Sequence, residues 1–327
     1  MKPTDSQPVD LQSLLRPAAA DLDRVRRRIE EVLGGSAAPV GEMLCQLHLG
    51  GGKMLRPALT LLSGQCVGLA GSDHIELGAI VEMIHLASLL HDDVIDQAQV
   101  RRKRPSANAL WGNTQAVLLG DFVLSKAFGL GAGLELSDAA AILCQTAEAI
   151  CTGEMRQNLR KGDWDLTEAE YLAIIEGKTA SLFGACCHLG ALAGRAEPSV
   201  CEQLRRYGVA LGMAFQMTDD LLDIVGSSRE EGKTLGTDFV HEKLTLPVIH
   251  WLGQGGGESQ KNRLKQLIAD AHSEELCAAV VTSGAVDYTL TRAEDYGRQA
   301  RACLIGLPDS PAKEALSGLV SFVTHRI

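Results

Sequence analysis

The sequence is poor in aromatic residues and in positive charge. Only 4% of its 327 residues are aromatic although 46% are hydrophobic, so Leu, Ala, Val and Ile must fill the core. That composition favours helices over a β-sandwich or barrel. The formal net charge of −10 argues against general nucleic-acid binding, which needs a basic face to release counterions from phosphates.

Other absences narrow the class of protein further. The nine cysteines form neither a Cys-x-x-Cys pair nor a His–Cys spacing suited to zinc, so we expect reduced thiols in the core of a cytoplasmic protein. No run of about 18 uncharged apolar residues is present, so we expect no membrane span. Residues 1–10 are polar, contain two prolines and lack a signal-peptide hydrophobic region, which predicts a flexible tail.

Strand patterns are also missing. We find no convincing alternating segments and no βαβ succession, which excludes a nucleotide-binding sheet. From Leu11 onward most segments have apolar residues at a helical period, and glycine or proline marks the joints between them. No linker divides the chain. The prediction is one all-α domain over residues 11–327, built as a large helical bundle.

What the chain does have is one short acidic pattern in two copies, each at the end of a long apolar stretch. On a helix the first and fifth residues of the pattern share a face, and the second lies about 100° round from the first. The two copies consist of Asp92, Asp93 and Asp96, and of Asp219, Asp220 and Asp223.

Clustered carboxylates at the end of an apolar helix repel one another and are costly to desolvate, unless cations lie between them. Mg²⁺ suits this role because it takes oxygen ligands and commonly bridges one or two carboxylates to substrate phosphates. A single copy would equally suit a solvated acidic helix end. Two copies in matching apolar settings favour a metal site on facing helices.

Cationic residues follow and precede the acidic patterns. The run from Arg101 to Pro105 begins five residues after Asp96, which favours a phosphate clamp over a solvated charge run or a targeting signal. Upstream, Lys53 and Arg56 follow three glycines, whose backbone can approach an anion closely, although the P-loop spacing is absent. Further candidates are Lys233, Lys243, and Lys178 with Thr179, which follow Gly177 at an expected helix break.

Two polar residues without formal charge stand beside the acidic patterns. His85 lies two helical turns before Asp92 on a similar face, where it can bond a phosphate oxygen, whereas we expect His91 to be structural. Gln216 precedes Asp219 by about a turn. Its carbonyl dipole can stabilise positive charge that develops beside a metal site.

These motifs resemble, in the same order, those of the trans-isoprenyl diphosphate synthases. They are Gly-Gly-Lys-x-x-Arg-Pro, His-x-Ala-Ser-Leu-Leu-His-Asp-Asp-x-x-Asp, Arg-Arg, Gly-Lys-Thr-Ala and Phe-Gln-x-x-Asp-Asp-x-x-Asp, from about Gly50 to Pro247. The chain is most similar to long-chain polyprenyl members such as the octaprenyl and solanesyl diphosphate synthases. The resemblance implies the all-α isoprenoid-synthase fold around a central cavity, a homodimer, and three Mg²⁺ ions for which Mn²⁺ can substitute.

The resemblance also implies roles for the candidate residues. The six aspartates would hold Mg²⁺ on the allylic diphosphate, and its further ligands would be Arg101, Lys178, Lys243 and Lys233. Isopentenyl diphosphate would be bound by Lys53, Arg56, His85 and Arg102. The backbone near Lys178 and Thr179 and the amide of Gln216 would face the allylic cation. Two residues depart from the family pattern: Lys103 and Glu242 stand where the family usually has glycine. Both affect the loop conformation that sets the positions of Arg102 and Lys243.

The expected reaction is a 1′–4 head-to-tail condensation of isopentenyl diphosphate with farnesyl or geranyl diphosphate, for which the released diphosphate is the expected base. A long all-trans product, of the kind used for quinone side chains, is expected because Ala87 and Ser88 are small where short-chain members carry a large aromatic. Small residues also simply let helices pack closely, with the tunnel floor near Phe128. The alternatives are a short-chain (C15/C20) synthase, a terpene cyclase, or a non-catalytic partner subunit.

Overall fold

A computed structural model describes residues 10–47, 52–68, 70–226, 236–255, 257–269 and 272–326. Its first half consists of α1 (Leu11–Leu15), η1 (Arg16–Ala18), α2 (Ala19–Gly34), α3 (Val40–Gln46), α4 (Leu55–Cys66), α5 (Ser72–Ile95), β1 (Val100–Arg101), β2 (Arg104–Pro105), α6 (Ala107–Trp111), α7 (Asn113–Ala132) and α8 (Ala139–Leu159). Its second half consists of α9 (Glu168–Ile175), η2 (Glu176–Ala180), α10 (Ser181–Ala193), α11 (Pro198–Val225), α13 (Thr237–Val240), α14 (Leu246–Gly253), α15 (Gly257–Ala269), α16 (Ser273–Thr282), α17 (Ala285–Ala302) and α18 (Pro311–Thr324).

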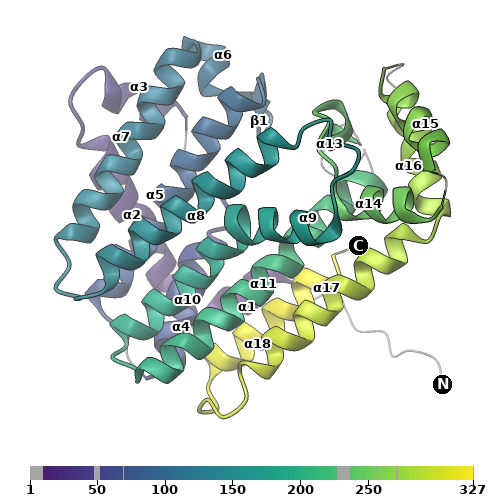
Figure 1. The fold of residues 1–327 in the computed structure, drawn as a ribbon. Helices are drawn as coiled ribbons and strands as arrows, with labels where there is room; N and C mark the ends of the chain where they lie inside the picture. The colour runs from purple at the N-terminus through teal and green to yellow at the C-terminus, as the bar shows by residue number, and fades with distance from the viewer. Residues whose placement is uncertain are drawn as a thin grey trace.

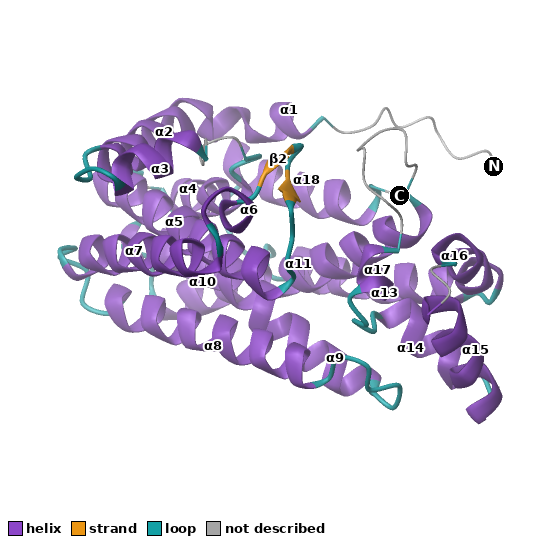
Figure 2. Ribbon diagram, turned by 90° about the horizontal axis from the view of Figure 1, so that it is seen from above, coloured by secondary structure: helices purple, strands orange, loops and turns teal. Residues whose placement is uncertain are grey.

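The prediction of an all-α fold is confirmed, with one small correction. Within the described residues the strands form a single two-stranded hairpin, β1–β2, beside the C-terminal end of α5 (Figure 2). The sequence analysis missed it because the turn residues, Arg102 and Lys103, are not the Asn-Gly or Asp-Gly pair typical of such a tight turn. The rest of the described chain is helices and connections (Figure 1).

The helix α5 runs through the bundle and presents its C-terminal end to the site. It packs on α2, α4, α7 and α10, and most of its side chains are buried. Gly78 permits the close approach of α2, because a Cβ there would lie 2.9 Å from a methyl group of Val25. A helix packed on so many sides holds the first acidic pattern in a fixed place.

The helix α11 carries the second acidic pattern and packs tightly on α10. Gly208 and Gly212 make this possible, since a Cβ on Gly208 would lie 2.3 Å from the carbonyl oxygen of Phe183, and one on Gly212 2.6 Å from the Cα of Ala180. Because α10 also contacts α5, it sets the distance between the two helices that carry the acidic patterns. Residues of α11 contribute to both hydrophobic core clusters of the protein.

The residues around Lys178 form a π-helical turn, η2, and not the helix break that the sequence predicted. The helix continues from α9 through η2 into α10. Gly153 of α8 and Gly177 bring the two backbones together, because a Cβ on Gly153 would lie 2.4 Å from the amide nitrogen of Lys178. Single π-helical turns inside longer helices are frequent at functional sites.

The cysteines are all free, and five of the nine are buried. The prediction that they fill the core is wrong for Cys45, Cys144 and Cys151, whose side chains are exposed. Among the helices that the structure describes, one, α7, is long and apolar enough to cross a membrane by length and composition alone. It carries Asp121 and Lys126 and packs along α5 and α8 as part of the bundle.

Candidate active site

The first acidic pattern places its carboxylates in different surroundings. Asp92 lies near the last turn of α5, where burial raises its pKa to about 6 against the opposing charge of Lys178. Asp96 caps the helix, and its Oδ2 accepts a hydrogen bond from Lys243 Nζ at 2.7 Å. Burial alone would raise the pKa of Asp96, but Lys243 lowers it below its usual value. Asp92 and Asp96 share one face of α5, and the charge of Lys178 acts on both carboxylates.

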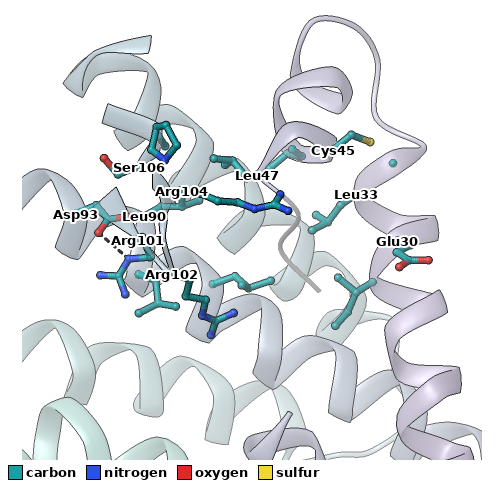
Figure 3. A pocket seen from close by; sticks show the side chains of 17 residues that line it. Glu30, Leu33, Cys45, Leu47, Leu90, Asp93, Arg101, Arg102, Arg104 and Ser106 are labelled. Atoms are coloured by element: carbon teal, nitrogen blue, oxygen red, sulfur yellow. Dashed lines mark hydrogen bonds and ion pairs between the residues drawn. The ribbon is translucent and has the colours of Figure 1, made fainter. Parts of the chain in front are cut away.

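Asp93, the middle residue of this pattern, turns toward the hairpin instead. It is only 2% exposed, and its Oδ1 accepts a 2.7 Å hydrogen bond from Arg101 Nε (Figure 3). Burial raises the pKa of Asp93, and the charge of Arg101 opposes that shift in part. This ion pair ties the hairpin to the end of α5.

Lys178 reaches the site from the π-helical turn. Its Nζ lies 2.5 Å from Glu154 Oε2 and donates to Gln157 Oε1 at 2.8 Å. Burial would lower the pKa of Lys178, but Asp92 and Glu154 outweigh that effect and raise it. Sequence reasoning missed Glu154 and Gln157, whose only signal is that they stand about one helical turn apart on a single helix.

The second acidic pattern repeats this division of roles. Asp219 is half-exposed, and its Oδ1 lies 3.9 Å from Arg326 Nη2. Asp220 is buried and accepts hydrogen bonds from Tyr171 Oη at 2.5 Å and from Gln216 Nε2 at 2.8 Å. Burial raises the pKa of Asp220 well above its usual value.

The third residue of that pattern, Asp223, accepts a 3.0 Å hydrogen bond from the backbone nitrogen of Asp238. Burial, reinforced by the charge of Asp223, raises the pKa of Asp238 to about 7. Sequence reasoning missed Asp238, because nothing in the spacing of residues after the second pattern marks it. Gln216, whose carbonyl accepts from Thr179 Oγ1 at 2.8 Å, connects this pattern to the π-helical turn.

A second group of cations gathers around His85. Burial lowers the pKa of His85 well below its usual value, and the charges of Arg56 and Arg102 lower it further, which leaves a neutral imidazole. Arg56 stacks over the Phe183 ring, with 5.1 Å between its Cζ and the ring centroid. The guanidinium of Arg102 lies beside Gly52, where a Cβ would come within 3.2 Å of its Nη2.

The members of this second group come from separate elements. Arg56 begins α4, His85 belongs to α5, and Arg102 stands at the hairpin turn. The buried carboxyl of Glu82 accompanies the two arginines, and burial raises its pKa while they oppose the shift. Two guanidinium groups beside one neutral imidazole make a site for a polyanion. Lys53 is exposed near its edge, and Lys233 lies outside the described residues.

Lys103 and Glu242, which stand where the family usually has glycine, have the positive φ angles that glycine favours. Arg102 and Lys103 have φ angles of 51° and 64°, and Glu242 has 53°. All three therefore occupy the left-handed region, which costs a residue other than glycine about 1–2 kcal/mol. The hairpin turn and the loop before Lys243 thus retain their shape with larger side chains.

A pocket of about 690 Å³ opens between α2, α3, α5 and the hairpin (Figure 3). Its apolar wall includes Leu33, Leu86 and Leu90, and Arg101 and Arg104 stand at its polar side. The proposed chain-length residues do not line it. Ala87 is buried on another face of α5, and the hydroxyl of Ser88 donates to the carbonyl of His85 at 2.8 Å. Their role in chain length stays a prediction.

The carboxylates fit a metal that arrives together with an anion. Among the described residues, no group of three or more His, Cys, Asp and Glu side chains could hold a metal ion alone. Asp96 Oδ1 is nevertheless buried without a hydrogen-bond partner, and Asp92 on the same face is poorly solvated. Mg²⁺ commonly takes one or two carboxylates and completes its coordination with waters and substrate phosphates. Asp93 and Asp220 have protein partners here, and their assignment as metal ligands stays a prediction.

Comparison with known proteins identifies the family. The sequence model of the polyprenyl synthetase family matches residues 38–283. The chain belongs to this family. It is 34% identical to octaprenyl diphosphate synthase of Escherichia coli over 97% of this chain and 99% of that protein. It is 37% identical to an all-trans-nonaprenyl-diphosphate synthase (geranyl-diphosphate specific) of Rhodobacter capsulatus, over 97% and 98%.

The fold comparison agrees with the sequence comparison. A polyprenyl synthase from Caulobacter crescentus CB15, solved with calcium and isoprenyl diphosphate, superposes with a TM-score of 0.92 at 36% identity. The alignment covers 98% of this chain and 99% of that one. The prediction of an isoprenoid-synthase fold is thereby confirmed.

Proposed function

We propose that this protein condenses isopentenyl diphosphate with an allylic diphosphate, farnesyl or geranyl diphosphate, and releases a long-chain all-trans polyprenyl diphosphate. Full-length similarity to octaprenyl and nonaprenyl diphosphate synthases carries the proposal. The enzyme is a prenyltransferase, and neither a short-chain synthase nor a non-catalytic subunit is favoured. Two separate groups of cationic side chains, one beside the acidic patterns and one around His85, suit two different diphosphates.

The allylic diphosphate would lie between the two acidic patterns. Asp92, Asp96 and Asp219 would hold its metal ions, and Lys178 and Lys243 would bind its oxygens. When bound, Mg²⁺ supplies positive charge that stabilises the departing diphosphate. The lysines add to that stabilisation because they are already placed where negative charge develops, so little reorganisation is needed.

Isopentenyl diphosphate would lie in the arginine group without metal. Arg56 and Arg102 would form paired hydrogen bonds with its phosphate oxygens, and neutral His85 would donate one more. Its double bond attacks the allylic cation, and loss of a proton regenerates an allylic diphosphate one isoprene unit longer. The departing diphosphate is the base in this scheme. Gln216 and Thr179, which form a hydrogen bond with one another, would present oxygen dipoles to the allylic cation.

The metal requirement follows from the carboxylates and from the relatives. Family membership, and the calcium and isoprenyl diphosphate bound to the similar Caulobacter protein, support a divalent cation. We propose Mg²⁺, three ions per active site, with Mn²⁺ as a substitute. The candidate ligands among the described residues are carboxylate oxygens, which suit Mg²⁺ or Mn²⁺ better than a metal that prefers sulfur or imidazole.

The quaternary state is proposed from an exposed apolar surface. Leu118 of α7 is 60% exposed and Leu159 of α8 is 81% exposed, and these two helices contact one another. A second copy of the chain would cover both, so we propose a cytoplasmic homodimer of one domain, residues 11–327. The variant Leu118→Arg should elute as a monomer in size-exclusion chromatography with light scattering. An unchanged dimer would place the interface elsewhere.

One assay tests the activity. Purified protein alone is incubated with Mg²⁺, labelled isopentenyl diphosphate and farnesyl diphosphate, and the products are sized by reversed-phase chromatography. We expect products longer than C20. Products that stop at C20 would assign a short-chain synthase, and no product without a second subunit would assign a partner of a heteromeric enzyme.

A further inference from the structure

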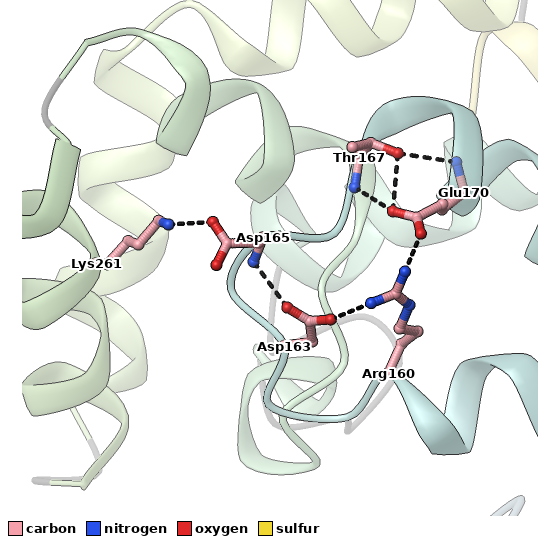
Figure 4. Close-up of polar contacts among 6 residues, drawn as sticks. All are labelled: Arg160, Asp163, Asp165, Thr167, Glu170 and Lys261. Carbon is pink, nitrogen blue, oxygen red and sulfur yellow. Dashed lines mark hydrogen bonds and ion pairs between the residues drawn. The ribbon is translucent and has the colours of Figure 1, made fainter.

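The loop between α8 and α9, residues 160–167, is held in place by a chain of polar contacts (Figure 4). Arg160 forms ion pairs with Asp163 and Glu170, and Asp163 accepts a 3.0 Å hydrogen bond from the backbone nitrogen of Asp165. Asp165 in turn pairs with Lys261 of α15. Contacts at both ends thus fix a loop that contributes no residue to the sequence motifs.

The fixed loop places Lys161 at the first acidic pattern. Lys161 Nζ lies 3.5 Å from Asp96 Oδ1, while Lys243 Nζ lies 2.7 Å from Asp96 Oδ2. One carboxylate therefore faces two lysines, one at each oxygen. Lys161 comes 65 residues after Asp96 and is absent from every motif that predicted the site.

The two loops that carry these lysines brace one another. The backbone nitrogen of Gly162 donates to the carbonyl of Glu242 at 3.0 Å. Gly162 has a φ of 70°, and a Cβ on it would lie 3.0 Å from Glu242 Oε2. Each braced residue is the sequence neighbour of a lysine on Asp96, so the contact sets the positions of Lys161 and Lys243 together.

Two lysines share the carboxylate of Asp96. An exposed ion pair would contribute little, but the side chains of Lys161 and Asp96 are only 25% and 22% exposed, and that of Lys243 is 8% exposed. The charge of Lys243 also opposes the raised pKa of the buried Asp238 carboxyl. One lysine can therefore leave Asp96 without leaving its carboxylate unpaired.

We propose that Lys161 is a positioning residue for the allylic diphosphate, acting through Asp96. Lys161 stays at ion-pair distance from Oδ1, which has no hydrogen-bond partner, and keeps the carboxylate oriented. This allows Lys243 to exchange its hydrogen bond with Asp96 for one with a metal-bound diphosphate. The inference rests on the proposed function, because it gives Asp96 and Lys243 the parts proposed for them in that reaction.

The test compares Lys161→Met with Lys161→Arg, and uses Lys265→Met, an exposed lysine of α15, as the control. Calorimetry measures the binding of inorganic diphosphate in the presence of Mg²⁺. Loss of a charge-assisted contact should weaken binding by about tenfold or more in Lys161→Met, with recovery in Lys161→Arg and no change in Lys265→Met. In kinetic assays the KM for the allylic substrate should rise by a similar factor, and the KM for isopentenyl diphosphate should stay unchanged.

A second variant keeps the lysine but moves its loop. Gly162→Ala puts a methyl group against the Glu242 carboxylate at a φ that disfavours alanine, so it should weaken diphosphate binding in the same direction. Binding within twofold of wild type in both Lys161→Met and Gly162→Ala would overturn the proposal, as would an equal rise in both KM values. If the wild-type protein bound diphosphate but formed no prenyl product, the proposed function would fail. The binding data would still show whether Lys161 contributes to diphosphate binding.

Discussion

The two acidic patterns have the same sequence spacing but different surroundings. In the first, Lys161 and Lys243 reach Asp96 from loops far away in the chain, and Arg101 reaches Asp93 from the adjacent hairpin. In the second, the partners include a tyrosine, a glutamine and a backbone amide, and Asp219 is half-exposed with Arg326 at 3.9 Å. The first pattern is thus electrostatically compensated before any ligand binds, whereas Asp219 is open to a metal from the solvent.

The patterns nevertheless share one division of roles. In each, the middle aspartate is buried against a protein partner, Asp93 against Arg101 and Asp220 against Tyr171. The helical period explains this, because the second residue lies about 100° from the first and so faces a neighbouring element. The duplicated motif therefore combines a pair of outward carboxylates with one carboxyl that fastens its helix.

The largest expected effect comes from the outward carboxylates. Asp92→Ala and Asp219→Ala should each lower kcat by at least about a hundredfold, because each removes a major electrostatic stabiliser. Steady-state assays with saturating substrates measure this, and activity should vanish in excess EDTA and return with Mg²⁺ or Mn²⁺. Full activity in EDTA, or a wild-type rate in either variant, would contradict a role of both patterns in metal binding.

The group of Arg56, Arg102 and His85, which should bind its diphosphate without metal, provides a contrast to both acidic patterns. Arg56→Ala should raise the KM for isopentenyl diphosphate by about tenfold or more, since it removes a charge-assisted contact, and should change the KM for the allylic substrate much less. Initial rates with each substrate varied in turn separate the two effects. Equal increases in both KM values would show that Arg56 does not distinguish the two diphosphates.

The first pattern should also respond to pH. Burial raises the pKa of Asp92 to about 6, so protons compete with the metal as pH falls through that value. The affinity for Mg²⁺ should then decrease by up to about tenfold per pH unit below 6 and level off above 7. Mg²⁺ titrations between pH 5 and 8 measure this dependence. Asp92→Asn should bind Mg²⁺ more weakly and lose the pH dependence; if it persists unchanged, another group is responsible.

The middle aspartates should affect stability more than metal binding. Asp93→Asn should lower the free energy of unfolding by about 1–3 kcal/mol, because it replaces an ion-paired carboxylate by a neutral amide opposite Arg101. Asp220→Asn should cost less, since burial raises the pKa of Asp220 well above its usual value and already disfavours its charged form. Denaturant unfolding measures both. A loss of activity as large as that of Asp92→Ala, with unchanged stability, would make these residues metal ligands after all.

The smallest effect on rate is expected beside the first pattern, where the growing chain should pass. Ala87→Phe should shift products towards C15 or C20 and leave the first condensation largely intact, because a ring there occupies volume that a longer chain needs. Reversed-phase analysis sizes the products, and Phe128→Ala tests the alternative tunnel floor. Unchanged product length in Ala87→Phe would show that the tunnel does not pass this residue.

The sequence alone predicted the helical fold and the residues of the motifs, because periodicity and charge spacing are local properties. It could not predict the partners that come from distant parts of the chain. Lys161, Glu154 and Asp238 reach the site only through the path of the chain in space, and the fixed position of Lys161 depends on the contact between Gly162 and Glu242. The sequence predicts a helix break at Lys178 where the structure has a π-helical turn, because Gly177 is compatible with either structure.

The most direct test of the account is a crystal structure of the enzyme with Mn²⁺ and a non-hydrolysable allylic thiodiphosphate, in which anomalous scattering locates the metal. We predict Mn²⁺ between the thiodiphosphate and the carboxylates of Asp92, Asp96 and Asp219. Lys243 should contact the diphosphate, and Asp93 should keep its hydrogen bond with Arg101. Manganese absent from these carboxylates, or a diphosphate bound only by the Arg56 and Arg102 group, would contradict it.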